Sequence, residues 1–447
     1  MKLRLLSDAD SREIYAAAIR ILREMGMRVM DGDTRRLLQK AGCREADTGH
    51  LLFDEQLVQK ATSSVPKRMV LFDRDGEAAV DSADTVPYFA PGLNCINVLD
   101  PSSGVHRLCT IRDIRETARL CDRLSNIDMA AGLGNPSDLP PSEQAMATVK
   151  ALAEGTRKPL AFIAHDEKED EEIWGYLADL AGGWHKLSDK PFALDLTGPY
   201  SPLELGEEAC RRLRFCARHR LPVVCYPALI TGAAGPVTLA GAIAQSSAEI
   251  LAGIVVHQLE QPGAPVISGS AVLPMDLMTG GIAYGSPEYG LACLGAVDFF
   301  GDLNIPTWFG AGCSDSHTVD AQAAAEAGMN LQTAVLSGTS FIHNLGYLSA
   351  GKTGSLEMLV LCDEIAGALK SFVRGIAVNE ETLAVEVIRR GYREHSFMMD
   401  EHTLRHMRTA LWQPVIFQRT TREQWSETGS ALALDRIRER LRELLER

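Results

Sequence analysis

Short apolar runs recur along most of this chain, and each is followed by a stretch with helical periodicity. Their spacing of roughly thirty to forty residues is that of one strand and one helix. Five runs begin with proline, which suits the first residue of a strand because no ladder donor is needed there. The runs cover residues 127–133, 159–164, 191–196, 222–226, 265–270, 306–312 and 340–346.

A weaker eighth unit follows at residues 375–378, with a helix expected over 380–390. Eight such units favour a closed (β/α)8 TIM barrel over an open doubly wound sheet, since no G-x-G-x-x-G follows a first strand. We therefore predict an α/β protein with an N-terminal helical cap and a C-terminal helical extension. The expected regions are a cap over 1–85, a bridging segment over 86–126, the barrel over 127–391 and the extension over 392–447.

Composition narrows the class of protein. A net charge of −14 without a dense Lys/Arg stripe argues against a nucleic acid partner, because binding phosphates needs a basic face. The N-terminal residues alternate charged and apolar side chains, unlike a signal peptide, and no segment is expected to span a membrane. The ten cysteines show no paired framework, which predicts buried, reduced thiols in a cytoplasmic protein. An apolar helix at 247–259 could serve a homo-oligomer interface.

In a TIM barrel, the residues that end the strands share one rim, where the chemistry takes place. The strand ends predicted here carry Asn135, His165, Asp166, Asp195, Thr197, Tyr226, Ser268, Ser270, Trp308, Phe309, Asp315, His343, Asn344 and Tyr347. Aromatic residues and acids are frequent in this set, and no lysine lies between residues 310 and 340. Aromatic faces and carboxylates suit a quaternary ammonium, which has no N–H to donate. The aromatic residues could equally pack the barrel mouth, and Asp315 could be a helix N-cap.

Several segments together carry a family resemblance: EMGMRV, VPKRMVLFDRDG, VLDPSSGVHRLCTIRDIRETARLCDRL, YGSPE, GAGCSDSHTVDAQAAAEA, HTLRHMR and FQRTTREQWSETGS. The chain resembles the trimethylamine methyltransferase family of corrinoid-dependent methyltransferases, and specifically members without pyrrolysine, such as glycine betaine methyltransferases. The resemblance implies a barrel that moves a methyl group from an amine to the Co(I) of a separate corrinoid protein.

The segment aligned with the pyrrolysine region, residues 320–326, reads DAQAAAE and offers no electrophile. A quaternary amine needs none, because it already carries a positive nitrogen and departs as a neutral tertiary amine. We therefore expect in-line displacement from glycine betaine or a related betaine. We expect no metal of the chain's own. The sequence DSHTVD has Asp320 where a cobalamin-binding D-x-H-x-x-G sequence has its glycine, so the corrinoid is expected on a partner that docks at the rim.

This hypothesis assigns roles to particular side chains. The acids are expected to set the electrostatic field of the site without touching the ammonium. A direct contact would be lost in value during the reaction, because the positive charge disappears as the methyl leaves. His343 and Asn344 could donate to a substrate carboxylate. The catalytic set is Asp195, Glu288, Asp315 and His343; the substrate-binding set is Tyr88, Tyr284, Trp308, Phe309, Phe341, Asn344 and Tyr347; the corrinoid-facing set is Ser270, Gly310, Gly312, Ser314 and Gln322.

Two other readings stay open. A zinc-dependent methyltransferase barrel could use Cys225, Cys313 and His343, which lie near strand ends where three ligands can converge. A barrel could also bind a betaine or a corrinoid without turning it over. Bound metal and methyl transfer to free cob(I)alamin would distinguish these readings.

Overall fold

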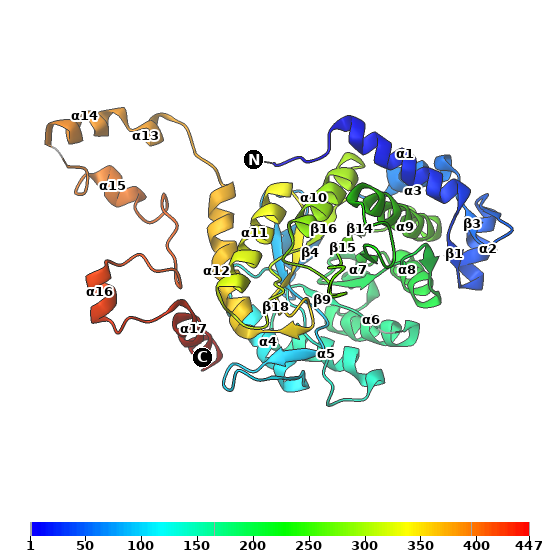
Figure 1. Ribbon diagram of the computed structural model, residues 1–447, viewed down its shortest axis with the longest axis horizontal. Helices are drawn as coiled ribbons and strands as arrows, with labels where there is room; N and C mark the ends of the chain where they lie inside the picture. The colour runs from blue at the N-terminus through cyan, green and yellow to red at the C-terminus, as the bar shows by residue number, and fades with distance from the viewer. Residues whose placement is uncertain (1, 165, 395, 447) are drawn as a thin grey trace.

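A parallel barrel surrounded by helices forms the centre of the computed structural model, which describes residues 2–164, 166–394 and 396–446 (Figure 1). Its strands run in the order β6, β17, β16, β14, β12, β10 and β9, and all neighbours pair in parallel. This arrangement confirms the predicted TIM-like fold. The strands are β6 (Tyr88–Pro91), β9 (Leu160–Phe162), β10 (Ala193–Thr197), β12 (Val223–Cys225), β14 (Val266–Gly269), β16 (Thr307–Gly310) and β17 (Phe341–Leu345).

An irregular extended segment joins the two edges of this sheet, β6 and β9. Ala130 forms a parallel bridge with Leu160 of β9. On the other side, the N–H groups of Asp128 and Met129 donate to the carbonyl of Phe89 in β6, at 2.8 and 3.1 Å. The run predicted over 127–133 therefore closes the barrel without forming a regular strand.

The first and the last strand of the predicted set need correction. The barrel already begins with β6, which lies in the segment expected to be a bridge. Residues 375–378 form no strand, and Ile376 and Val378 are 91% and 74% exposed. The eight units therefore begin one strand earlier than the apolar runs indicated, and β6 takes the place assigned to 375–378.

Alternating side chains along the strands build two cores. One set fills the barrel interior and includes Leu194, Val224, Ile267, Trp308 and Phe341. The other set packs against the outer helices. These helices are α4 (Ile111–Arg123), α5 (Pro141–Gly155), α6 (Glu167–Ala181), α8 (Glu207–His219), α9 (Leu239–Glu260), α10 (Pro287–Asp302), α11 (Ala321–Ser337) and α12 (Leu356–Val373).

Local signals fixed several helix boundaries. Thr110 caps α4 in a capping box with Asp113, as its position before an apolar helical pattern predicts. The helical N-terminal region contains α1 (Asp8–Glu24), α2 (Gly32–Lys40) and α3 (Glu55–Ser64). Short strand pairs accompany these helices: β1 (Arg28–Val29) pairs with β11 (Glu204–Leu205), β2 (Arg44–Glu45) with β3 (Leu51–Leu52), and β4 (Val70–Phe72) with β5 (Ala78–Asp81).

Further short strands and helices complete the described chain. A four-stranded sheet contains β7 (Asn97–Leu99), β8 (His106–Leu108), β18 (Tyr347–Leu348) and β19 (Thr353–Gly354), and β13 (Ala228–Ile230) pairs with β15 (Ala271–Leu273). A short helix, α7 (Trp184–Asp189), follows α6. All ten cysteines are buried free thiols, as predicted.

Helix α9 differs from two sequence-based expectations. It is long and apolar enough to cross a membrane by length and composition, although no such segment was expected. However, 78% of its most apolar window is buried inside the protein. It packs against α1, α3 and α8, so it is a core helix. Because its apolar residues are covered within one chain, the suggestion that 247–259 forms an oligomer interface is wrong.

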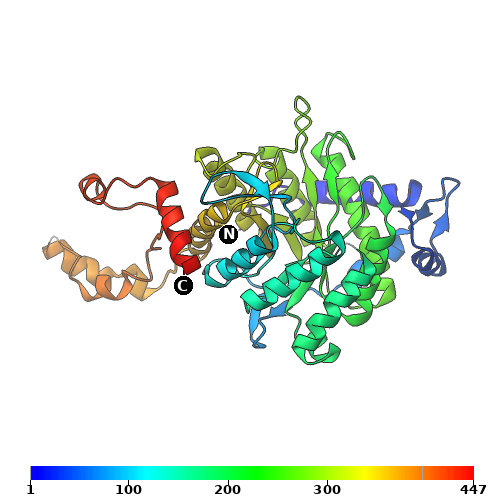
Figure 2. The ribbon, with the colours of Figure 1, turned by 90° about the horizontal axis from the view of Figure 1, so that it is seen from below.

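Beyond α12 the chain leaves the barrel as an arm, defined here as residues 374–394 and 396–432 (Figures 1 and 2). The arm carries α13 (Glu380–Leu383), α14 (Val385–Glu394), α15 (Glu401–His406) and α16 (Arg422–Glu427). The chain then returns through α17 (Ala433–Glu446), which packs on α12 and α4. Before α17, the Glu364 carboxylate on α12 accepts hydrogen bonds from the N–H groups of Val415, Ile416 and Phe417.

Candidate active site

A cavity of about 480 Å³ opens at the carboxyl ends of the barrel strands. Its walls come mainly from the ends of β6, β9, β10, β12 and β17, from β15 and from one face of α8. Among the described residues that line it, none is a lysine. The lining residues are Leu93, Asn94, Ile163, Ala164, Leu196, Thr197, Gly198, Pro199, Tyr200, Glu208, Ala209, Arg212, Tyr226, Ala228, Ala271, Leu273, Tyr284, His343, Asn344 and Tyr347.

Tyrosines from different loops form the aromatic part of this wall. Tyr284 and Tyr347, both predicted for substrate binding, line the cavity, and Tyr226 joins them from the end of β12. The Tyr226 ring meets the His343 ring edge-on, with centroids 5.3 Å apart and an interplanar angle of 86°. Tyr226 was predicted to lie at a strand end but was not assigned to the substrate-binding set. The cavity therefore has the aromatic lining that a cation requires.

The hydroxyl of Tyr347 fixes the loop that follows β6. It accepts hydrogen bonds from the N–H groups of Leu93 and Asn94 at 2.8 and 3.2 Å, and it donates to the Asn94 side-chain oxygen at 3.1 Å. A Cβ atom at Gly92 would lie 1.7 Å from the Tyr347 ring, so only glycine fits there. Tyr347 is thus both a cavity wall and the support of a second wall.

His343 is held as a neutral ring. Its Nδ1 lies 3.1 Å from the carbonyl oxygen of Phe309, and because a carbonyl can only accept, Nδ1 carries the proton. Burial lowers the pKa of His343 to about 3. The other nitrogen, Nε2, is therefore an acceptor, and in this tautomer it has no proton to donate to a substrate carboxylate, contrary to the role expected from the sequence.

Asn344 sits at an irregularity of β17. Its backbone has φ of 75°, in the left-handed region, and the register with β6 shifts between Ile342 and Leu345. Bulges of this kind redirect a side chain, and such strained positions occur often at functional sites. Gly310 on β16 makes room for it, because a Cβ there would lie 2.8 Å from the Asn344 amide nitrogen. The side chain lines the cavity.

Asp315 holds a loop of the cavity wall and does not itself line the cavity. Its two carboxylate oxygens accept hydrogen bonds from the N–H groups of Tyr284 and Gly285, at 2.9 and 2.8 Å. Burial raises the pKa of Asp315, and these hydrogen bonds oppose the rise. Its own N–H donates to Glu326 at 2.8 Å, and so does the Ser314 hydroxyl at 2.6 Å. Glu326 lies in the DAQAAAE segment, so that segment supports the Tyr284 loop from α11.

Four residues of the predicted substrate-binding set lie elsewhere. Trp308 and Phe341 are inside the barrel, and the Trp308 ring lies 4.9 Å from the His343 ring between centroids, tilted by 39°. Phe309 faces the outer helices and is 1% exposed. Tyr88 begins β6, at the opposite end of the strand from the cavity, and donates to Asp84. None of these four side chains lines the cavity.

Asp195 belongs to a buried charge cluster behind the cavity wall. It is fully buried, and its two carboxylate oxygens accept hydrogen bonds from Nε and Nη2 of Arg212 on α8. Arg212 also donates to the carbonyls of Ala164 and Leu196, at 2.8 and 3.0 Å. Burial, together with the nearby Asp195 carboxylate, raises the pKa of Asp170 well above its usual range, which favours the protonated form of Asp170. Arg212 lines the cavity and was not predicted.

The remaining predicted residues that the structure describes do not line the cavity. Glu288 is exposed in the first turn of α10, and Ser270 faces Ser246 of α9 at 3.0 Å. Gln322 is exposed and donates to Glu326 at 2.8 Å. Gly312 has φ of 77° and its N–H donates to Asn330 at 2.6 Å. His165 lies outside the described residues.

The three residues considered for zinc do not converge. The Cys225 thiol faces the Ile250 carbonyl of α9, and the Cys313 thiol faces Asn330 of α11. Burial raises the pKa of Cys225 to about 12, which disfavours the thiolate that zinc requires. In the part of the chain that the structure describes, Cys225, Cys313 and His343 are not among the groups close enough to share a metal ion.

Comparison with known proteins identifies the family. The model of a family described as trimethylamine methyltransferase (MTTB) matches residues 1–447. The chain belongs to the trimethylamine methyltransferase family. This membership confirms the resemblance predicted from the sequence and the class of enzyme, a methyltransferase.

Relatives within the family cover most of the chain. A trimethylamine methyltransferase of Methanosarcina barkeri is 31% identical over 444 residues, which cover 96% of this chain and 88% of that protein. A glycine betaine methyltransferase of Desulfitobacterium hafniense is 26% identical over 428 residues, covering 95% of this chain and 89% of that protein. The crystal structure of the Methanosarcina barkeri monomethylamine methyltransferase matches with a TM-score of 0.56 at 12% identity, covering 99% of this chain and 88% of that one. The structural match supports the fold.

Proposed function

We propose that this methyltransferase moves a methyl group from a quaternary amine with a carboxylate, such as glycine betaine, to the Co(I) corrinoid of a separate protein. The observation that carries the proposal is the tyrosine-lined cavity at the barrel mouth, which contains Tyr226, Tyr284 and Tyr347 and no lysine among its described lining residues. Aromatic faces attract a desolvated quaternary ammonium by about 0.5 to 2 kcal/mol each. The similarity to a glycine betaine methyltransferase supports the same substrate class.

Asp315 and His343 suit a substrate that loses its positive charge during reaction. A carboxylate in contact with the ammonium would favour the ground state over the transition state. Asp315 uses its oxygens on the backbone of Tyr284 and Gly285, so it acts here as a positioning residue. His343, with its pKa lowered to about 3 by burial, stays neutral and does not repel the cation.

Arg212 supports the choice of a betaine over an amine without a carboxylate. It is a cavity-lining cation, and four of its five N–H groups are used by Asp195, Ala164 and Leu196. The fifth N–H has no hydrogen-bond partner among the described residues and can meet a carboxylate, and Asn344 offers an amide to the same cavity. We assign the carboxylate end of the substrate to these two side chains.

The corrinoid is the methyl acceptor, so it is the second substrate of the reaction. It supplies Co(I), a nucleophile able to displace a tertiary amine in line with the methyl group. The protein's part is to align the methyl with the open mouth of the barrel and to exclude water. We propose that the corrinoid protein docks on the loops that follow β9, β10, β14 and β16. Residues of the Ser314–Gln322 segment then lie beside the docking site.

Activity assays with reduced cobalamin test this function directly. The purified chain would be incubated with cob(I)alamin and glycine betaine, proline betaine, carnitine, γ-butyrobetaine or trimethylamine, and methylcobalamin would be followed by absorbance. We expect turnover of at least one betaine and a far lower rate with trimethylamine, because the chain offers no covalent catalyst for a tertiary amine. A comparable rate with trimethylamine contradicts the quaternary-amine assignment. Binding of a betaine without any methyl transfer would favour the non-catalytic barrel.

We also propose that the enzyme is a cytoplasmic homo-oligomer, with the arm as the self-association surface. The arm exposes apolar side chains that are costly to leave in water, including Ile376 at 91%, Met398 at 80% and Met399 at 81% exposed. Light scattering of the full-length chain and of the Ile376→Ser/Met398→Ser/Met399→Ser variant tests this. A monomeric wild-type protein at micromolar concentration contradicts it.

A further inference from the structure

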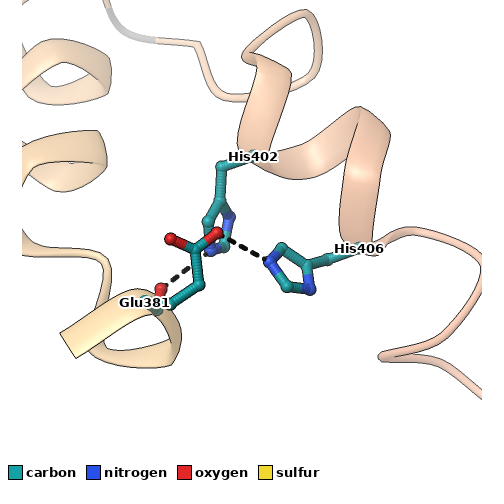
Figure 3. A group of neighbouring side chains, drawn as sticks. All are labelled: Glu381, His402 and His406. Carbon is teal, nitrogen blue, oxygen red and sulfur yellow. Dashed lines mark hydrogen bonds and ion pairs between the residues drawn. The ribbon is translucent and has the colours of Figure 1, made fainter. Parts of the chain in front are cut away.

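Two histidines and one glutamate meet on the arm, far along the chain from the barrel strands (Figure 3). His402 and His406 lie on α15, and Glu381 lies on α13. One potential ligand atom from each residue lies within 4.8 Å of the other two. Figure 3 shows both rings directed toward Glu381.

The potential ligand atoms of this group lie near one another. His406 Nε2 lies 3.1 Å from the Glu381 carboxylate, and His402 Nε2 lies 3.1 Å from the Glu381 carbonyl oxygen. Ligands about 2.0 to 2.2 Å from a tetrahedral zinc ion lie about 3.4 Å from one another. The two ring nitrogens and the carboxylate oxygen, which lie within 4.8 Å of one another, therefore need to move closer together to share one ion.

Helix geometry explains why these residues share a face. His402 and His406 are four positions apart, so α15 places both rings on the same side. Asp400 caps α15 by accepting the His402 N–H at 2.9 Å, and it also pairs with Arg390 of α14. Asn379 caps α13, so Glu381 is in its first turn. Each ligand is thus presented by a helix with a defined start.

We propose that Glu381, His402 and His406 form a binding site for one divalent transition metal ion, with zinc as the reference ion. Two imidazoles and one carboxylate are a ligand set that zinc accepts with a fourth position left to water. Neutral imidazole and carboxylate also suit other late first-row ions. This site departs from the sequence-based expectation that the chain has no metal of its own.

The site is separate from the methyl-transfer cavity and does not depend on the proposed substrate. Its sequence, HTLRH, lacks the glutamate that follows the first histidine in H-E-x-x-H metalloproteases, so it carries no hydrolytic base of that kind. The ion would join α13 to α15 and fix the fold of the arm. In the metal-free state the imidazoles donate from Nε2, so binding moves each Nε2 proton to Nδ1 or to solvent.

One neighbouring charge opposes the ion. Arg405 pairs with Glu381 at 3.2 Å, and its side chain is 63% exposed. Binding a cation requires Arg405 to leave the carboxylate, which its exposure permits. Arg405→Gln should therefore tighten metal binding, by up to about fivefold if the pair is a typical exposed one. Tighter binding in this variant is not expected for an ion held elsewhere.

The test uses the full-length chain after dialysis against a chelator. Zn²⁺ is titrated in calorimetry with a competing chelator, and Co²⁺ serves as a spectroscopic probe of coordination. We expect one equivalent in the wild type. Loss of a residue that only supports a metal ligand costs about 10- to 100-fold in affinity, so removal of a ligand in His406→Ala or Glu381→Gln should cost at least about 100-fold.

His185→Ala is the matched control, because His185 is an exposed histidine on a helix with an acid, Asp189, 3.5 Å away but no second histidine. It should leave the stoichiometry and affinity unchanged. Limited proteolysis of the arm gives a second readout: Zn²⁺ should slow cleavage in the wild type and in His185→Ala, but not in His406→Ala. The proposal is overturned if the wild type and a His402→Ala/His406→Ala variant bind Zn²⁺ equally, or if the wild type binds less than one equivalent.

Discussion

The Nδ1 atom of His343 lies 3.1 Å from the carbonyl oxygen of Phe309 on the neighbouring strand, and this contact fixes the protonated nitrogen of the ring. Burial lowers the pKa of His343, and also that of His257, to about 3. The unfolded chain takes up protons on both residues near pH 6.5, whereas the folded chain does not. The folded state therefore loses stability as the pH falls from 6.5 toward 3.

The His343 contribution can be measured by difference. Each of these histidines should cost about 3 kcal/mol of unfolding free energy between pH 7 and pH 4.5. In His343→Gln, the loss over this interval should shrink by about that amount. Urea unfolding at the two pH values measures it, with exposed His185→Gln as the control. An unchanged pH dependence in His343→Gln would show that the ring is not held neutral.

Substitutions of Tyr226 and Trp308 compare a side chain that lines the cavity with a side chain in the barrel core. Tyr226 lines the cavity, whereas Trp308 is 2% exposed inside the barrel. Tyr226→Leu should weaken betaine binding by up to roughly thirtyfold, the upper end of one cation–π contact. Trp308→Leu, in contrast, should mainly lower stability, by up to about 3 kcal/mol. Substrate titration measures the loss of affinity, and thermal unfolding measures the loss of stability. Equal loss of affinity in both variants would show that Trp308 also contacts the substrate.

Asp315 should matter for the position of Tyr284 more than for the fold. In Asp315→Asn one of the two backbone N–H groups, of Tyr284 or Gly285, loses its acceptor, since the amide has a single oxygen. A hydrogen bond to a charged group is worth about 1.5 to 3 kcal/mol, so kcat/KM should fall about tenfold or more. Steady-state assays with the best betaine measure this. If the activity of Asp315→Asn is normal, the 284–285 loop is held by other contacts.

Removing only one partner of the buried ion pair between Asp195 and Arg212 should strongly lower the free energy of unfolding. Arg212→Met leaves the Asp195 carboxylate buried without its partner, which typically costs about 3 to 5 kcal/mol. The double variant Asp195→Leu/Arg212→Met should lose less stability than Arg212→Met alone. Urea unfolding of the single and double variants tests this. A double variant less stable than Arg212→Met would indicate that Asp195 has other essential partners.

The proposed docking of a corrinoid protein on the loops after the strands can be tested by changing charges in these loops. Asp276 lies in the exposed loop after β15, and Asp166 caps α6 after β9. Asp276→Lys should slow methyl transfer to the corrinoid protein more than transfer to free cobalamin, because only the protein meets the loop. Parallel assays with the two acceptors measure this. Equal slowing of both reactions would show that this loop does not recognise a partner.

The barrel could be predicted because its strands are apolar on both faces and five of the runs begin with proline, so they stand out from the helices. Strand β6 was missed as part of the barrel because Pro91 and Gly92 interrupt its apolar run after three residues. Residues 375–378 were mistaken for a strand because Ile376 and Val378 have strand-like side chains. Only tertiary contacts could show that they lie exposed on the arm.

The candidate site was predicted in part. Tyr284 and Tyr347 line the cavity as expected, since aromatic residues after a strand end point into the mouth of a barrel. The alternation of side chains along β16 could not be assigned without the register, so Trp308 and Phe309 were both placed at the rim. Arg212 was missed because it lies on a helix. Its one signal is an arginine on the apolar face formed by Ala209, Leu213 and Cys216.

The hydrogen bonds from Val415, Ile416 and Phe417 to Glu364 mean that the arm is fastened at both ends. The arm is a long loop that leaves the barrel after α12 and returns to it before α17, and not a free tail. A single protease cut in its exposed part would therefore leave α17 in place through Ile437, Leu441 and Leu444, which are buried. The nicked protein would run as two fragments under denaturing conditions and as one particle under native conditions.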